Sequence, residues 1–243
     1  MSIDYSPVQY ELLLPWQLRK TVATRPVVYI PLGTYEWHGE HLPVGLDSLT
    51  AHGLCLRAAA IDGGVVLPPL YYGTGGGHGA YPWTVIKANP DELETQLMFT
   101  LERMQAFGFL LAVLFSGHFA DTQLEMIDRV AANWNRRDAT LRVFATAVNR
   151  IEGLVYAPDH AGIFETTLLA AMRPDLVQLE RLAPLSEAPL AASEQDFSET
   201  RHDPNHPIWG VFGPDPRQFN GEQAQPLLSA CTSWIVSKVR ARV

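Results

Sequence analysis

The chain has 243 residues, of which 47% are hydrophobic and 18% are charged, and its formal net charge is −8. A chain of this length buries enough surface for a core, and its apolar content excludes disorder over most of its length. Its longest apolar runs reach about half of the roughly 20 residues that span a bilayer. No basic stripe is available to neutralise phosphates. We therefore expect neither a membrane span nor a nucleic-acid partner.

The amino-terminal segment and the cysteines indicate the compartment. In residues 1–20 the acidic residues precede the apolar run, and the segment lacks the basic start of a signal peptide. Cys55 and Cys231 lie far apart and fit no metal or disulfide spacing. We expect both to be buried apolar side chains in a reducing, cytoplasmic environment.

Short apolar runs rich in β-branched residues alternate with segments of helical periodicity. We expect strands at residues 27–30, 65–67, 109–115 and 141–145. We expect helices at residues 47–60, 91–107, 121–136, 163–172 and 223–240. The run at 109–115 is continuously apolar, which is typical of a central parallel strand covered on both faces. This alternation predicts an α/β fold of three layers, a mainly parallel central sheet flanked by helices, in a single domain over residues 1–243.

Two segments have no regular pattern. Residues 73–79 are dense in glycine and predict an irregular loop; a phosphate cradle would require a GxxxxGK[ST] sequence, which is absent. Residues 173–222 are rich in Pro, Glu, Ser and Asp, and we expect an irregular excursion over the surface, at a subunit interface.

Ionisable residues crowd the segment that follows the first expected strand. Glu36, His38, Glu40 and His41 fall within six residues, and Asp47 follows after a Gly/Pro loop. In extended backbone, side chains two positions apart point the same way, as Glu36 and His38 would. Such a cluster beside a buried strand is costly unless it is paired or metal-bound. Carboxylates with an imidazole suit Zn²⁺, Mn²⁺ or Fe²⁺. A solvated loop, with Asp47 as an ordinary helix cap, is the alternative.

Two further clusters follow later in the chain. His118 lies at the carboxyl end of the 109–115 strand, the edge at which open parallel sheets bind ligands. His160 and Glu165 flank the start of the 163–172 helix. The alternatives are a hydrogen-bonded structural histidine at 118 and an acid that simply favours a first helical turn at 165.

Taken together, the three clusters resemble the creatininase family of metal-dependent amidohydrolases. Residues 31–47, PLGTYEWHGEHLPVGLD, resemble the family pattern P-x-G-[ST]-x-E-x-H-G-x-H-L-P-x-x-x-D. Residues 116–121, SGHFAD, are a weaker version of N-G-H-x-x-N, whereas residues 160–166, HAGIFET, match H-A-G-x-x-E-T fully. A glycine-rich stretch ending in His78 also resembles the family, and the likeness extends from about residue 10 to residue 172.

The resemblance implies an α/β fold with two divalent metal ions per chain, in a homo-oligomer that is often a hexamer. Zinc is the expected metal, with manganese or iron as alternatives. Creatininase itself takes a ligand from a Glu at the position of Ala120, so the carboxylate assigned here to the second ion is Glu165. By the same resemblance the metal ligands are Glu36, His38, Asp47 (bridging), His118 and Glu165. The catalytic residues are His160 and Glu165, and the substrate contacts are His78, Phe119, Tyr156 and Asp159.

The resemblance implies hydrolysis of a C–N amide bond, cyclic or linear, in a small metabolite by metal-activated water. Two departures argue against creatinine as the substrate. Ser116 and Asp121 replace the two Asn residues of the second motif, and no Trp stands close before His160, the nearest being Trp134 and Trp209. The alternatives are a formamide deformylase, a peptidase acting on a modified peptide, a metal-dependent lyase or isomerase, and a non-catalytic binding protein.

Overall fold

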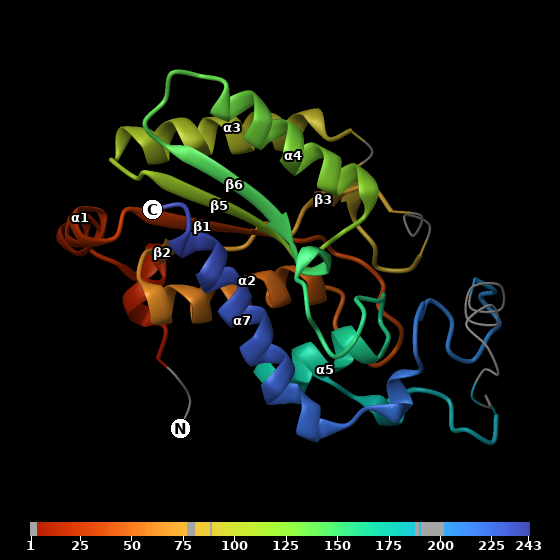
Figure 1. Ribbon diagram of the computed structural model, residues 1–243. Helices are drawn as coiled ribbons and strands as arrows, with labels where there is room; N and C mark the ends of the chain where they lie inside the picture. The colour runs from red at the N-terminus through yellow and green to blue at the C-terminus, as the bar shows by residue number, and fades with distance from the viewer. Residues whose placement is uncertain (1–3, 77–80, 88, 188–189, 191–201) are drawn as a thin grey trace.

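A four-stranded parallel sheet lies at the centre of the computed structural model, which describes residues 4–76, 81–87, 89–187, 190 and 202–243 (Figure 1). The strand order is β2-β1-β5-β6. The strands are β1 (Val27–Leu32), β2 (Val65–Val66), β5 (Leu111–Ser116) and β6 (Arg142–Ala147). Every residue of β1 and β5 is buried, as expected for strands covered on both faces. Their register pairs Leu32 with Ser116, so the two carboxyl ends lie side by side.

Helices cover both faces of the sheet, which confirms the predicted α/β fold with three layers (Figure 1). One face carries α3 (Asp91–Ala106) and α4 (Asp121–Asn135). The other carries α2 (Leu46–Asp62), α5 (Ile163–Met172) and α7 (Ala224–Arg240). Successive residues of β1 point to opposite faces: Tyr29 packs in the core under α2 and α7, and Ile30 packs under α3 and α4.

The expected helices and strands of the sheet form within one or two residues of their predicted ends, but three elements were not foreseen. The helix α1 (Pro15–Thr24) buries none of its residues fully, and Leu18 and Val22 are only partly buried where they pack against the core. The strand β3 (Gly73–Thr74) lies within the predicted irregular loop 73–79, and it pairs in parallel with β4 (Ile86–Lys87), for which no element was predicted. Each is two residues long, too short for any alternation to be visible, and the Thr74 hydroxyl donates to the Lys87 carbonyl at 2.7 Å.

The segment 173–222 is irregular, as predicted, but it is not simply a surface excursion. Its described parts contain short 3-10 helices and send Leu182, Ile208 and Val211 into a small core that also holds Leu42 and Ala161. These contacts bind the segment to the loops that carry the expected site residues. The 3-10 helices of the described chain are η1 (Ser6–Val8), η2 (Tyr10–Leu12), η3 (Val148–Arg150), η4 (Pro174–Leu176), η5 (Leu179–Arg181), η6 (Pro216–Gln218) and η7 (Gly221–Gln223).

None of the helices in the described residues is both long enough and apolar enough to cross a membrane.

Candidate metal centre

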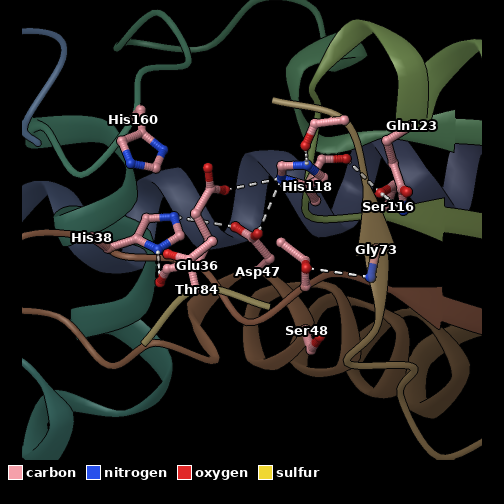
Figure 2. A network of polar contacts seen from close by, with 12 residues as sticks. Glu36, His38, Asp47, Ser48, Gly73, Thr84, Ser116, His118, Gln123 and His160 are labelled. Carbon is pink, nitrogen blue, oxygen red and sulfur yellow. Dashed lines mark hydrogen bonds and ion pairs between the residues drawn. The ribbon is translucent and has the colours of Figure 1, made fainter. Parts of the chain in front are cut away.

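Five buried ionisable side chains meet beyond the carboxyl ends of β1 and β5, and Figure 2 labels all of them except Glu165. Two come from the loop after β1, one from the loop after β5, and one each from the first turns of α2 and α5: Glu36, His38, His118, Asp47 and Glu165. Gly117 permits this convergence, because a Cβ at that position would lie 2.0 Å from the Asp47 carbonyl oxygen. The glycine of the second motif thus lets the end of β5 approach α2 directly.

His118 faces two carboxylates. Its Nδ1 lies 3.1 Å from Glu36 Oε2 and 3.2 Å from Asp47 Oδ2. Its Nε2 lies 3.2 Å from the carbonyl oxygen of Gly75, which can only accept, so the Nε2–H donates there. In a neutral ring, Nδ1 therefore presents a lone pair to Glu36 and Asp47.

His38 repeats this arrangement on the other side of Asp47. Its Nε2 lies 3.3 Å from Asp47 Oδ1 and 3.5 Å from Glu165 Oε2. Its Nδ1–H donates to the Glu36 carbonyl oxygen at 2.9 Å, so in the neutral ring Nε2 also presents a lone pair to carboxylates. Asp47 stands between the two imidazoles and turns one oxygen toward each (Figure 2).

This geometry fits two divalent cations that share Asp47. The potential ligand atoms of Glu36, Asp47 and His118 lie within 4.8 Å of one another, as do those of His38, Asp47 and Glu165. Glu36 Oε1 and His38 Nε2 are buried without a hydrogen-bond partner, so both have a lone pair to offer. An imidazole whose outer N–H donates to a backbone carbonyl is the usual arrangement of a metal-binding histidine. The donor atoms, nitrogen and oxygen without sulfur, suit Zn²⁺, Mn²⁺ or Fe²⁺.

The pKa values of these side chains in the metal-free protein also indicate that the cluster favours positive charge. Burial acts to lower the pKa of His38, but the charges of Glu165 and Asp47 outweigh it and raise the pKa to about 10. For His118, burial is likewise outweighed by its interactions with Asp47 and Glu36, and its pKa lies well above the usual value. Burial, aided by the charges of Asp47 and Asp159, raises the pKa of Glu165. Without a bound cation, these raised pKa values favour protons at the positions where cations would fit.

A cavity of about 480 Å³ opens onto this cluster. His160 lies on its wall, and its ring centre is 4.3 Å from that of His38. The Nε2–H of His160 donates to the Trp37 carbonyl oxygen at 2.9 Å. His160 also has a ligand atom within 4.8 Å of those of Glu36 and His38, so its position alone suits either a proton carrier or a ligand.

Of the four expected substrate contacts, only Phe119 lines this cavity in the described part of the chain. Asp159 is turned to the start of α5, where its carboxylate accepts hydrogen bonds from the backbone N–H groups of Gly162, Phe164 and Glu165. Burial raises the pKa of Asp159 to about 7 despite these bonds. Tyr156 packs against the core under α2 and α7. His78 lies outside the described residues.

The crowded segment 36–47 separates into two kinds of residue. Glu40 is exposed, and His41 is buried with its Nε2 3.1 Å from the Thr166 hydroxyl. Burial lowers the pKa of His41 to about 3, so this ring is neutral and ties the loop to α5. Asp47 does not cap α2: the N-cap is Gly45, and no side chain caps the helix. The solvated-loop and helix-cap alternatives are therefore wrong for Asp47.

Sequence reasoning missed residues that hold and surround the cluster. Gln123 of α4 donates to the Ser116 hydroxyl at 3.3 Å and accepts from the Thr74 N–H at 3.1 Å. Gln123 thereby links the end of β5 to β3, the strand that precedes Gly75. The carbonyl oxygen of Gly75 in turn accepts the hydrogen bond from His118 Nε2. Gln123 is one of several polar residues on an amphipathic helix, and nothing in the sequence distinguishes it from the others. Cavity-lining residues without an expected role are Gly76, Ala120, Asp121 and Thr122.

Comparison with known proteins gives a consistent result over nearly the whole chain. A family model described as "Creatininase: Creatinine amidohydrolase" matches residues 14–239. The creatinine amidohydrolase of Pseudomonas putida is 25% identical over 238 residues, 88% of each chain. The mycofactocin precursor peptide peptidase of Mycolicibacterium smegmatis is 30% identical over 177 residues, 68% of this chain and 66% of the relative.

Solved structures share the fold. A crystal structure of creatinine amidohydrolase covers 96% of this chain and 97% of its own, with a TM-score of 0.74 and 25% identity. A mutant creatininase of the Zn-Zn type has a TM-score of 0.75 over 99% of this chain and 98% of its own; at 23% identity this likeness concerns the fold alone.

Proposed function

Because the chain belongs to the creatininase family of amidohydrolases, we propose that it hydrolyses an amide C–N bond of a small metabolite at a centre of two divalent metal ions. The observation that carries this proposal is the pair of buried triads that share Asp47, each with an imidazole nitrogen facing carboxylates.

In this proposal Glu36, Asp47 and His118 hold one ion, and His38, Asp47 and Glu165 hold the other. Three carboxylates carry a charge of −3, and two divalent ions carry +4, so the loaded cluster has a net charge of +1 when both imidazoles are neutral. That charge suits a hydroxide ion. Zinc is the metal we expect, because a creatininase of the Zn-Zn type shares this fold. Manganese is the alternative, since another structure with this fold is titled creatininase Mn.

Bound divalent ions would lower the pKa of a water molecule and polarise the amide carbonyl. The ligand side chains would fix the positions of the ions, and a further side chain would transfer the proton. Hydrolysis joins the water oxygen to the carbonyl carbon, breaks the C–N bond and places one proton on the departing nitrogen. Because the Nε2–H of His160 donates to the Trp37 carbonyl, Nδ1 is the nitrogen that we assign to this proton transfer. The cavity wall, including Phe119, surrounds the substrate.

A second candidate is cleavage of a modified peptide. It is favoured by the 30% identity to a mycofactocin precursor peptide peptidase, which extends over 68% of this chain. The same residues would act in the same roles, and the two candidates differ in the size of the substrate and in the product released.

We also propose that the chain forms a homo-oligomer, a hexamer by resemblance to the family. Exposed apolar side chains of the amino-terminal region, Leu12, Leu14 and Trp16, support an interface there. Light scattering of the purified protein tests the subunit number; a monomer at all concentrations would contradict the proposal.

Metal content per chain, measured by plasma mass spectrometry on protein purified without an affinity tag or chelator, tests the proposed function. About two equivalents of zinc, manganese or iron are expected. Almost no metal, and no uptake on addition, would contradict it. A screen of amides, lactams and carboxyl-terminally modified peptides then separates the candidates, because ammonia or formate indicates a small amide and amino-acid release indicates a peptide.

A further inference from the structure

Asp121 carries a charge on the cavity wall that the metal cluster does not use. It is the first residue of α4, three positions after His118, and it lines the cavity with Phe119 and Thr122. Its side chain is exposed, and it belongs to none of the groups of potential ligands. In the family pattern this position is Asn, so the charge is a departure of this chain.

In the described part of the chain, no basic side chain on the cavity wall offsets this charge. Among the described residues, no lysine or arginine lines the cavity, and Asp121 forms no salt bridge. The carboxylates of Glu36 and Asp47, in contrast, face the imidazole of His118, and Glu165 faces that of His38. Asp121 is thus the carboxylate of this wall left to interact with whatever enters the cavity.

An acid in the first turn also stabilises a helix. That effect would account for an acid at the start of α4 without any role in binding. The two roles have different consequences. Helix stabilisation does not depend on the charge of the substrate, whereas a charge on the cavity wall discriminates between substrates by their own charge.

We infer that Asp121 determines specificity by favouring amides that carry an ammonium or guanidinium group beyond the scissile bond and by disfavouring those with a carboxylate there. The inference rests on the proposed function, because it assumes that the scissile amide lies at the ligand cluster. From the cluster the rest of a small substrate extends along the wall of the 480 Å³ cavity, of which Asp121 is part.

Three hydroxamates test this inference. A hydroxamate group chelates divalent metal, and the rest of the molecule is then free to contact the cavity wall that includes Asp121. The probes have similar length: 4-aminobutanohydroxamate with a cationic tail, pentanohydroxamate with a neutral tail, and succinic monohydroxamate with an anionic tail. Dissociation constants are measured by calorimetry on metal-loaded protein of known metal content. We expect the cationic probe to bind about fivefold more tightly than the neutral one, and the anionic probe about fivefold more weakly.

Asp121→Asn keeps the size of the side chain and should abolish both differences. The matched control is Glu125→Gln, which removes the same charge from an exposed position one turn further along α4 and should leave both differences intact. Equal binding of the three probes to the unaltered protein would overturn the inference, and so would an equal effect of the two substitutions. Failure of every probe to bind, or absence of metal, would instead overturn the proposed function and the inference with it.

Discussion

Asp47 connects the two halves of the candidate site through a single carboxylate. Oδ1 lies 3.3 Å from His38 Nε2, and Oδ2 lies 3.2 Å from His118 Nδ1. Asp47 lies buried in the first turn of α2, and the end of β5 approaches it closely at Gly117. The directions of its two oxygens are the observation that supports the proposed bridging role.

Asp47→Asn should therefore empty both metal positions, because the amide has one oxygen and no charge. Metal content by plasma mass spectrometry is the measurement. The matched control is Asp91→Asn, which alters an exposed acid in the first turn of α3 and should leave the content unchanged. Retention of the full metal content by Asp47→Asn would show that the residue does not bridge.

His160→Ala should leave metal content unchanged and lower kcat by about 10²- to 10⁴-fold, the usual contribution of a general acid or base. The reason is that its Nε2–H is held by the Trp37 carbonyl, with the ring beside the cluster. Turnover and metal content are measured on the same preparation, with His52→Ala, on α2, as the control. Loss of metal from the His160 variant would make this residue a ligand instead.

At the scale of elements, the start of α5 is held by one buried carboxylate. Asp159 accepts the N–H groups of Gly162, Phe164 and Glu165 at 3.2, 2.9 and 3.3 Å. The Ala161 N–H in turn donates to Glu165 Oε2 at 2.6 Å. The turn that begins the helix therefore also orients the carboxylate that faces His38.

Asp159→Ala should lower the free energy of unfolding by about 1–3 kcal/mol, because it leaves buried N–H groups without an acceptor. Urea unfolding of the metal-free protein is the measurement. Asp159→Asn, which retains one acceptor oxygen, should lose less. If both variants unfolded at the same urea concentration as the unaltered protein, the carboxylate would not stabilise the start of α5.

At the scale of the whole molecule, the candidate ligands come from segments that span residues 36–165. An ion that joins them binds the folded chain and not the unfolded one, so it stabilises the fold by mass action. In the absence of metal, His38 has a pKa of about 10, and the pKa of His118 is also raised, so both rings hold a proton at neutral pH.

Metal binding must displace these protons, so affinity should rise with pH between 6 and 8, by up to about tenfold per displaced proton for each pH unit. At constant total zinc, the difference in Tm between loaded and chelator-treated protein should widen over this range. Scanning calorimetry at several pH values measures it. A difference that stays constant or narrows as pH rises would contradict the assignment of His38 and His118.

The alternation of helices and strands and the residue types of the candidate site were predictable from the amino-acid sequence, because hydrophobic periodicity and motif spacing are local properties. Residue type alone did not separate His41 from His38 or Asp159 from Glu165; the family resemblance assigned His38 and Glu165 to the metal and Asp159 to the substrate. The folded structure shows where the other two side chains lie: His41 contacts Thr166 of α5, and Asp159 accepts hydrogen bonds at the start of α5.

The same reason accounts for the elements that were missed. The pairing of β3 with β4 and the packing of Leu182 and Ile208 against the site loops depend on contacts between residues distant in the chain. The facing of His38 and His118 across Asp47 is also a long-range property, produced where the end of β5 passes α2 at Gly117. Local pattern selects which side chains are available, and the packing of β5 against α2 decides which of their atoms meet.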